Sequence, residues 1–354
     1  MLPAERRARL LRELRVHGAL RTEEFAARVA ASGMTIRRDL ADLEGAGLLR
    51  RVHGGAIAPG ERSALSQTSS PVATIGIVVP SAAYYFPEVI RGARMVLGEA
   101  GARLVLAVSD YSPEREREQI RRLLAREVDG LLVPPSAHAA DDPATYQLLA
   151  EGPQPVVVLE RTLEGSPWRG ALDTVRCDHE VGGVLAAEHL LEGGCSRIVV
   201  ATRSGPTAPL VRAGVARALR AVGLEAEELG LPAADADPGV QQRLLQELVR
   251  RSAVGEVDGV VVLPDEVAIG LVDIAEDAGV RVPEDLAVVA YDDEVAALCS
   301  TPVTAVAPPR YEVGEAGAQL CLQRVLSRMR GGATRAWSSL ELSPDLRARA
   351  TTRS

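Results

Sequence analysis

The chain has 354 residues, of which 47% are hydrophobic and 25% are charged, a composition typical of a globular protein with two or three domains. Its apolar stretches are shorter than the roughly 18 residues that a membrane-spanning helix requires, and no secretory leader is recognisable. The four cysteines stand apart without a Cys-x-x-Cys pair, so we expect free thiols in a reducing cytoplasm.

The net charge of −8 is unevenly distributed along the chain. Residues 1–56 contain 11 arginines and 7 acidic residues, a balance of +4, whereas the remainder carries −12. Every fixed positive charge is an arginine, because the chain contains no lysine. A small basic unit on an acidic body is typical of a protein whose N-terminal end binds nucleic acid; a chance imbalance of surface charge is the alternative.

The N-terminal unit has the pattern of three short helices followed by a β-hairpin. Helices are predicted over residues 4–16, from the capping residue Thr22 onward, and from residue 33 to about residue 44 behind the capping residue Ser32. In the third helix, apolar residues recur at i, i+4 and i+7 and are expected to face inward: Ile36, Leu40 and Leu43. Strands are predicted at residues 48–51 and 56–58.

This arrangement predicts a winged helix-turn-helix over residues 1–56. Its third helix fits the major groove of B-DNA and presents Thr35, Arg37 and Arg38 outward, where arginine can bind guanine edges or phosphate through two parallel hydrogen bonds. Arg50 and Arg51 on the hairpin are expected to meet backbone phosphates. The alternative for the helix arginines is a solvated surface.

The same segment resembles the DNA-binding domain of the DeoR family. The resemblance rests on Thr35, Ile36, Arg37, Arg38, Asp39 and Leu40, and then on Arg51, Val52, His53, Gly54, Gly55 and Ala56. It implies that Thr35 and the helix arginines lie at DNA and that the wing with His53 lies beside it, although His53 is equally well explained as a turn residue. Asp39 is expected to hold arginines or to cap structure rather than to contact an anionic duplex.

A Ser-, Pro- and Gly-rich linker is predicted at residues 57–72, and an α/β body follows at residues 73–345. Strands are expected at residues 74–79, 103–108, 130–133, 155–159, 197–201, 259–263 and 286–290. Amphipathic helices are expected between and after them at residues 87–100, 113–126, 180–192, 208–222, 238–252, 266–278 and 313–329. This alternation predicts parallel sheets covered on both faces, arranged as two lobes with a cleft.

The body resembles the sensor domain of the LacI/GalR family, which is related to periplasmic sugar-binding proteins. The resemblance rests on the segments 75–80, 128–132, 182–183, 214–219 and 257–315. It implies a two-lobed fold that binds an effector between its lobes, at the carboxyl ends of the strands.

At matching positions, the resemblance places the aromatic residues Tyr84, Tyr85 and Phe86 after the first strand, where they would pack against an effector such as a sugar. Asp292 matches the family's acidic residue that accepts hydrogen bonds from effector hydroxyls. Further expected effector contacts are Glu160, Arg161, Asp178 and Asp265. The alternatives are loop packing for the aromatic residues, a turn or helix cap for the aspartates, and a surface ion pair for Glu160 and Arg161.

Two positions depart from the family pattern. Val211 stands where the family commonly has an effector-binding arginine; Arg212 follows it, and a helix turns about 100° per residue, so Arg212 is expected to point elsewhere. Pro264 replaces the polar residue that usually precedes the family's aspartate. The effector is therefore expected to differ from the family's common hexose.

Other function classes are disfavoured. The chain lacks the sequence motifs of serine hydrolases, nucleotide-binding loops and zinc sites, so we expect neither catalysis nor a cofactor or metal. A sugar-transport protein would not carry the DeoR-like segment. The sensors that usually accompany DeoR-type heads bind phosphorylated sugars, and this body does not match them; a regulator that senses a sugar phosphate stays the alternative. We expect a cytoplasmic homodimer that represses transcription from double-stranded operator DNA, with its affinity changed by a free sugar or related metabolite.

Overall fold

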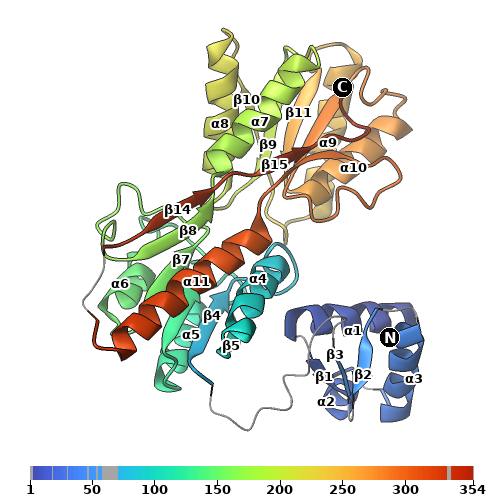
Figure 1. The fold of residues 1–354 in the computed structure, drawn as a ribbon. Helices are drawn as coiled ribbons and strands as arrows, with labels where there is room; N and C mark the ends of the chain where they lie inside the picture. The colour runs from blue at the N-terminus through green and yellow to red at the C-terminus, as the bar shows by residue number, and fades with distance from the viewer. Residues whose placement is uncertain are drawn as a thin grey trace.

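The computed structural model of the chain describes residues 3–17, 19–29, 31–45, 48–52, 55–57, 71–332 and 336–353. These residues form a small N-terminal unit and two larger α/β lobes (Figure 1). Within them, no helix is long and apolar enough to cross a membrane. The predicted linker lies almost entirely outside the described residues.

The N-terminal unit consists of three helices and a three-stranded sheet. The elements are α1 (Pro3–His17), β1 (Ala19–Arg21), α2 (Thr22–Arg28), α3 (Gly33–Gly45), β2 (Arg50–Val52) and β3 (Gly55–Ile57). Its apolar core contains Leu10, Phe25 and Ile36, so the predicted amphipathic faces do pack inward. The predicted hairpin is present with slightly shifted ends. Strand β1 was not predicted from the sequence because it is only three residues long; it pairs antiparallel with β3.

The first lobe, called the N-lobe here, has a six-stranded sheet in the order β14-β8-β7-β6-β4-β5, and all its neighbouring strands are parallel. Its strands are β4 (Thr74–Val79), β5 (Arg103–Val108), β6 (Gly130–Val133), β7 (Val156–Leu159), β8 (Asp173–Cys177) and β14 (Ser339–Leu342). Its helices are α4 (Phe86–Glu99), α5 (Pro113–Ala125), α6 (Pro143–Glu151) and α11 (Arg310–Met329). Helices α4 and α11 cover one face of the sheet and α5 and α6 cover the other.

The second lobe, the C-lobe, has a six-stranded sheet in the order β10-β9-β11-β12-β13-β15, parallel except for the edge strand β15. Its strands are β9 (Ile198–Arg203), β10 (Glu227–Leu231), β11 (Gly259–Leu263), β12 (Ala287–Tyr291), β13 (Thr304–Ala307) and β15 (Asp345–Arg347). Its helices are α7 (His179–Glu192), α8 (Ala208–Ala221), α9 (Pro238–Ala253) and α10 (Asp265–Asp277). Helices α7 and α8 cover one face and α9 and α10 cover the other.

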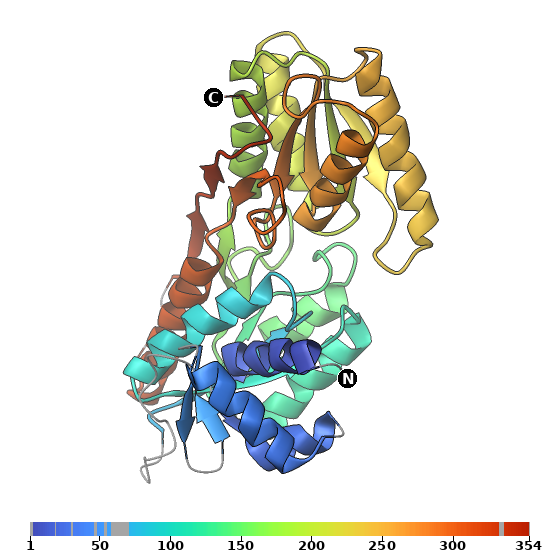
Figure 2. The ribbon, with the colours of Figure 1, turned by 90° about the vertical axis from the view of Figure 1, so that its right-hand side faces the viewer.

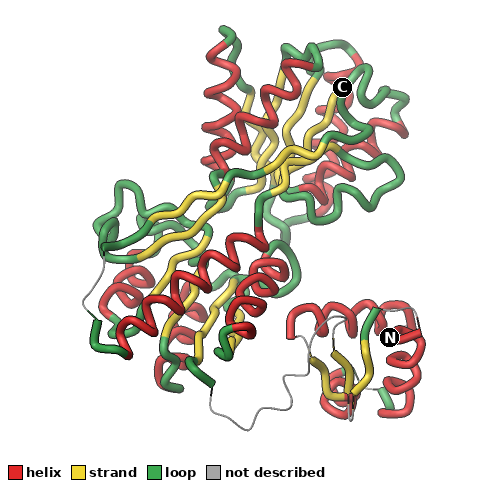
Figure 3. The backbone as a smooth tube through the Cα atoms, in the orientation of Figure 1, coloured by secondary structure: helices red, strands yellow, loops and turns green. Residues whose placement is uncertain are grey.

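The chain crosses between the lobes three times, after β8, after β13 and between β14 and β15 (Figures 1 and 2). Figure 3 shows the result as two strand layers, each flanked by helices. The predicted parallel, two-lobed α/β architecture is therefore confirmed. Its unpredicted elements are a short helix (α6) and short or edge strands (β8, β10, β13, β14 and β15), whose few residues carry too little periodicity to be detected.

One helix pair in each lobe packs at very close range through glycine. A Cβ atom at Gly92 of α4 would lie 2.0 Å from the carbonyl oxygen of Tyr311 in α11, and one at Gly314 would lie 2.0 Å from that of Val89. The C-lobe repeats this arrangement, because a Cβ atom at Gly214 of α8 would lie 2.0 Å from the carbonyl oxygen of Glu180 in α7. Any larger residue would force the helices apart.

We therefore expect Gly92→Ala to destabilise the protein by about 3 kcal/mol or more, because backbone atoms must move to make room. Gly98 lies on the same helix but is exposed, and a Cβ atom there meets nothing within 4 Å. Gly98→Ala should instead stabilise the helix by about 0.5–1 kcal/mol. Urea denaturation of both variants checks this, and equal effects would contradict the close-packing argument.

Candidate functional site

Helix α3 of the N-terminal unit presents polar side chains to solvent. Ser32 caps it as predicted, because its Oγ accepts a hydrogen bond of 3.1 Å from the backbone N–H of Thr35. With the apolar face of α3 buried, Arg37 and Arg38 are exposed and Thr35 is half-buried. The helix can therefore offer two guanidinium groups to an anionic or hydrogen-bond-accepting surface.

Asp39 on the opposite side of α3 holds arginines of another helix. It is buried and accepts hydrogen bonds from Arg6 Nε at 2.5 Å and Arg7 Nε at 3.0 Å, both on α1. Burial disfavours its charged form, but the hydrogen bonds and charges of the two arginines outweigh this effect and hold the pKa of Asp39 below its usual value. Asp39 thus ties α3 to α1, a pairing of residues about 30 positions apart.

The wing residues are described only in part. Arg51 binds Glu44 at the end of α3, through its Nε at 2.6 Å and its backbone N–H at 2.8 Å. This ion pair is solvent-exposed, and such pairs contribute about 1 kcal/mol or less, so a phosphate group could replace Glu44. The side chain of Arg50 and the whole of His53 lie outside the described residues.

A second group of functional side chains joins the two lobes. Tyr84, in the loop between β4 and α4 of the N-lobe, donates from its hydroxyl towards two carboxylates of the C-lobe. The distances are 2.8 Å to Asp265 Oδ1 and 3.1 Å to Asp292 Oδ2. Asp265 opens α10 after β11, and Asp292 follows β12, so the ends of two neighbouring strands supply the pair.

The next tyrosine belongs to a chain of polar contacts near the crossing from β8 to α7. Tyr85 donates to Glu160 Oε1 at 3.0 Å. Glu160 Oε2 lies 3.2 Å from His179 Nε2, and His179 Nδ1 lies 3.1 Å from the hydroxyl of Tyr291. Since Glu160 belongs to the N-lobe and His179 and Tyr291 to the C-lobe, this chain also connects the lobes. We call Tyr84, Tyr85, Glu160, His179, Tyr291, Asp265 and Asp292 the interlobe site.

The remaining predicted contacts have structural surroundings. Phe86 is buried in the core of the N-lobe, and its ring packs edge-to-face against the ring of Tyr85, with 5.3 Å between the centroids. Asp178 caps α7 by accepting from Val181 N at 3.1 Å. Arg161 is buried, and its Nη1 donates to the carbonyl oxygen of Glu160 at 2.6 Å, while its Nε has no hydrogen-bond partner among the described residues.

Backbone strain gathers at the interlobe site. Tyr85, Glu160 and Asp292 have φ angles of 61°, 55° and 97°, in the left-handed region that non-glycine residues rarely adopt. Each such residue costs on the order of 1–3 kcal/mol and persists only where the surroundings hold it. Contacts of the surrounding sheets and loops therefore hold these three residues in place despite the free-energy cost of their backbone conformations.

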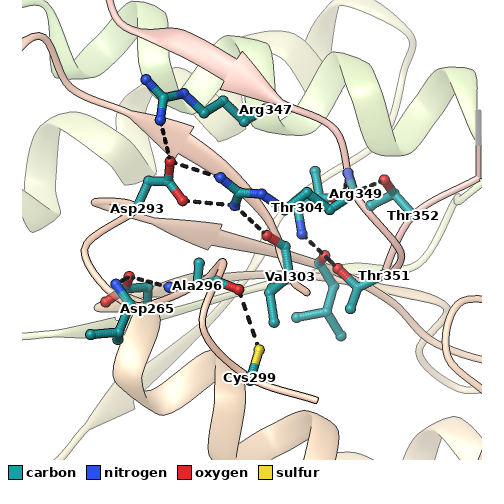
Figure 4. A network of polar contacts seen from close by, with 12 residues as sticks. Asp265, Asp293, Ala296, Cys299, Val303, Thr304, Arg347, Arg349, Thr351 and Thr352 are labelled. Atoms are coloured by element: carbon teal, nitrogen blue, oxygen red, sulfur yellow. Dashed lines mark hydrogen bonds and ion pairs between the residues drawn. The ribbon is translucent and has the colours of Figure 1, made fainter. Parts of the chain in front are cut away.

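The site is also unbalanced in charge. Nearby arginines form ion pairs with other carboxylates. Arg310 pairs with Glu294 at 2.6 Å. Arg347 and Arg349 pair with Asp293 at 3.1 Å and 2.7 Å (Figure 4). Among the described residues, no basic side chain forms an ion pair with Asp265 or Asp292. Burial, and next the charge of Asp265, raise the pKa of Asp292 to about 7.

The sequence does not single out Tyr291 or Arg310, whereas it places Asp178 and His179 together in a turn at the edge of the cleft. Tyr291 ends a buried strand and reads as a core residue. The hydroxyl of Tyr291 contacts His179 across 112 positions, which no local pattern reveals, and Arg310 pairs with Glu294, 16 positions away, across an intervening strand. The expectation for Arg212 is confirmed: it binds Thr202 and Glu228, and Val211 lies in the core of the C-lobe.

Comparisons with known proteins agree with both parts of this structure. The DeoR-like helix-turn-helix domain matches residues 6–62, and the periplasmic binding protein-like domain matches residues 187–352. The chain is a DeoR-like helix-turn-helix fused to a periplasmic-binding-protein-like domain. The chain is 28% identical over 86% of its length to the arabinose metabolism transcriptional repressor of Geobacillus stearothermophilus, of which the match covers 84%.

Two solved structures share its fold. The transcriptional repressor ascG of Escherichia coli is 25% identical, with a TM-score of 0.63 over 80% of this chain and 100% of that one. A complex of the transcriptional regulator CelR with cellobiose is 26% identical, with a TM-score of 0.66 over 91% of both chains. These relatives of the chain are transcriptional repressors or regulators, and the larger part of the chain fits a small-molecule sensor.

The raised pKa of Asp292 predicts a pH dependence of stability. An unfolded Asp titrates near 3.8, so between about pH 4 and pH 7 the folded protein binds more protons than the unfolded chain, and stability falls as pH rises through this window. The stability of Asp292→Asn, which cannot ionise at this position, should fall less than that of wild type between pH 5 and pH 8, by on the order of 2–3 kcal/mol. Urea denaturation at both pH values measures this, with Asp235→Asn as an exposed control. Equal pH dependence in wild type and Asp292→Asn would contradict it.

Proposed function

We propose that this chain is a sequence-specific transcription regulator, a repressor whose operator affinity is changed by a small-molecule effector bound between the lobes. The observation that carries the proposal is that a DeoR-like helix with exposed arginines belongs to the same chain as a two-lobed domain whose facing lobes present tyrosines and buried carboxylates. The DNA-binding part spans residues 1–56 and the sensor residues 73–345. The regulator acts in the cytoplasm, where its operator is.

In this proposal, α3 enters the major groove. Arg37 and Arg38 bind base edges or phosphates and Thr35 supports them, while Arg50, Arg51 and His53 of the wing meet the backbone. Two copies form a homodimer on an inverted repeat whose half-sites are about one helical turn, or a multiple of it, apart. An effector that changes the relative placement of the lobes changes the spacing of the two DNA-binding units, which requires a coupling of roughly 1–3 kcal/mol.

The interlobe site favours a neutral, hydroxyl-rich effector. Asp265 and Asp292 can accept hydrogen bonds from hydroxyl groups, and tyrosine rings pack well against the C–H faces of sugars. The Nε of Arg161, which has no hydrogen-bond partner in the described part of the chain, offers a donor. A phosphate group is disfavoured, because two buried carboxylates without a basic partner among the described residues repel an anion. The sugars named for relatives, arabinose and cellobiose, are the first effectors to test.

The DNA-binding half is tested with operators selected from random DNA by the full chain. Arg37→Ala and Arg38→Ala should each weaken binding by about 1–3 kcal/mol in fluorescence anisotropy at fixed salt. Arg12→Ala, an exposed arginine of α1, is the matched control for loss of one charge. Unchanged affinity in both α3 variants would refute α3 as the recognition helix.

The sensor half is tested by thermal shift of the purified chain against free sugars, polyols, nucleosides and sugar phosphates. A ligand at 100 times its dissociation constant should add about 2.7 kcal/mol of stability. Asp292→Ala should abolish that response while DNA affinity in the absence of effector stays as in wild type. A response to sugar phosphates alone would replace the free-sugar proposal by the phosphorylated one.

A further inference from the structure

Tyr84 occupies an unusual position for a residue that faces a ligand site. Its loop belongs to the N-lobe, but its hydroxyl lies between two carboxylates of the C-lobe, at 2.8 Å from Asp265 and 3.1 Å from Asp292. A phenol has one hydrogen, so it can satisfy only one of the two carboxylates at a time. The surroundings of the hydroxyl are strongly acceptor-rich, and burial together with the two carboxylates raises the pKa of Tyr84 far above its usual value.

The other contacts of the two carboxylates show what this hydroxyl does. Asp265 Oδ2 accepts from the backbone N–H groups of Val295 and Ala296, at 2.7 Å and 3.0 Å. For Asp265 Oδ1 and Asp292 Oδ2, the Tyr84 hydroxyl is the only hydrogen-bond donor among the described residues. These are the atoms to which the proposed function assigns the effector hydroxyls. An effector hydroxyl and the Tyr84 hydroxyl therefore compete for the same acceptors.

Resting on the proposed function, we infer that Tyr84 is a built-in competitor of the effector and selects ligands that carry two adjacent hydroxyl groups. A vicinal diol brings two donors where Tyr84 brings one, so it satisfies both Asp265 and Asp292 at once and displaces the phenol. A ligand with a single hydroxyl only reproduces the hydrogen bond that it replaces. The hydrogen bond lost with Tyr84 therefore lowers the net affinity for weak or monohydroxylated ligands.

Displacement of Tyr84 also breaks a contact between the lobes. The lobes keep other polar contacts when this happens, because the pairs Glu160–His179 and Glu294–Arg310 do not involve Tyr84. His179 begins α7, directly after the chain leaves the N-lobe, so its pair lies at a crossing point. Binding of the diol is therefore coupled to a change in how the lobes meet, with the crossings intact.

The test compares wild type, Tyr84→Phe and Tyr146→Phe in the full-length chain. Tyr84→Phe removes only the hydroxyl between the lobes. Tyr146→Phe removes a buried hydroxyl that donates within the N-lobe, to the carbonyl oxygen of Ala137 at 3.0 Å, and so controls for the loss of a buried tyrosine hydroxyl. Small-angle X-ray scattering without added sugar should give a larger radius of gyration for Tyr84→Phe and an unchanged one for Tyr146→Phe.

Calorimetric titration then uses L-arabinose and cellobiose, together with a monodeoxy analogue of each that lacks one hydroxyl of a diol. Tyr84→Phe should bind the sugars about tenfold more tightly than wild type, because no hydroxyl has to be displaced. It should bind the monodeoxy analogues more tightly by a similar factor, because either ligand displaces the hydroxyl in wild type, whereas Tyr146→Phe should match wild type for every ligand.

Two results would overturn the inference. Unchanged scattering of Tyr84→Phe would show that the hydroxyl does not hold the lobes, and weaker sugar binding would make Tyr84 an effector contact rather than a competitor. Failure of the proposed function would give a different set of results. If no sugar binds any variant and α3 substitutions leave DNA binding unchanged, the regulator assignment fails, while the scattering comparison still decides whether Tyr84 joins the lobes.

Discussion

The parallel arrangement of strands in both lobes is the constraint on which the interlobe site depends. Parallel strands end at the same edge of a sheet, so the loops that follow them are brought together whatever their separation along the chain. Tyr84 follows β4, Glu160 follows β7, Asp265 follows β11 and Asp292 follows β12. Four segments spread over more than 200 residues thus meet because each continues from the same end of a strand.

Buried carboxylates are compensated in two different ways in this protein, either by arginines or by backbone N–H groups and a shared phenol. Asp39 in the N-terminal unit accepts from two arginines, and Asp293 in the C-lobe also pairs with two. Asp265 uses two backbone N–H groups and shares one phenol with Asp292. A buried charge that is fully paired stabilises one arrangement, whereas a carboxylate with a single shared donor can exchange that donor for a ligand.

The N-terminal unit and the two lobes differ in how they hold the side chains of their candidate sites. Arg37 and Arg38 need only the apolar face of one helix behind them, so a short domain with a small core can present them. The interlobe site needs two complete sheets, strained residues at the strand ends and close helix packing through glycine in each lobe. This explains why the two-lobed domain is several times larger than the N-terminal unit.

The sequence by itself determined the local elements and the residues that follow them. Its periodicities predicted the helices of the N-terminal unit and the main strands and helices of both lobes. Its motifs indicated α3 as the DNA-binding helix, and the resemblance to a family of two-lobed sensors implied Tyr84, Glu160, Asp265 and Asp292 at the ends of strands. The tertiary structure decided which side chains contact one another. Arg6 and Arg7 bind Asp39, and His179 contacts Glu160. The hydroxyl of Tyr84 lies between Asp265 and Asp292. The tertiary structure also placed α11 against the N-lobe, β14 in the N-lobe sheet and β15 in the C-lobe sheet. These features join residues about 20 to more than 200 positions apart, and such pairings follow from how whole sheets and helices pack rather than from any local pattern of side chains.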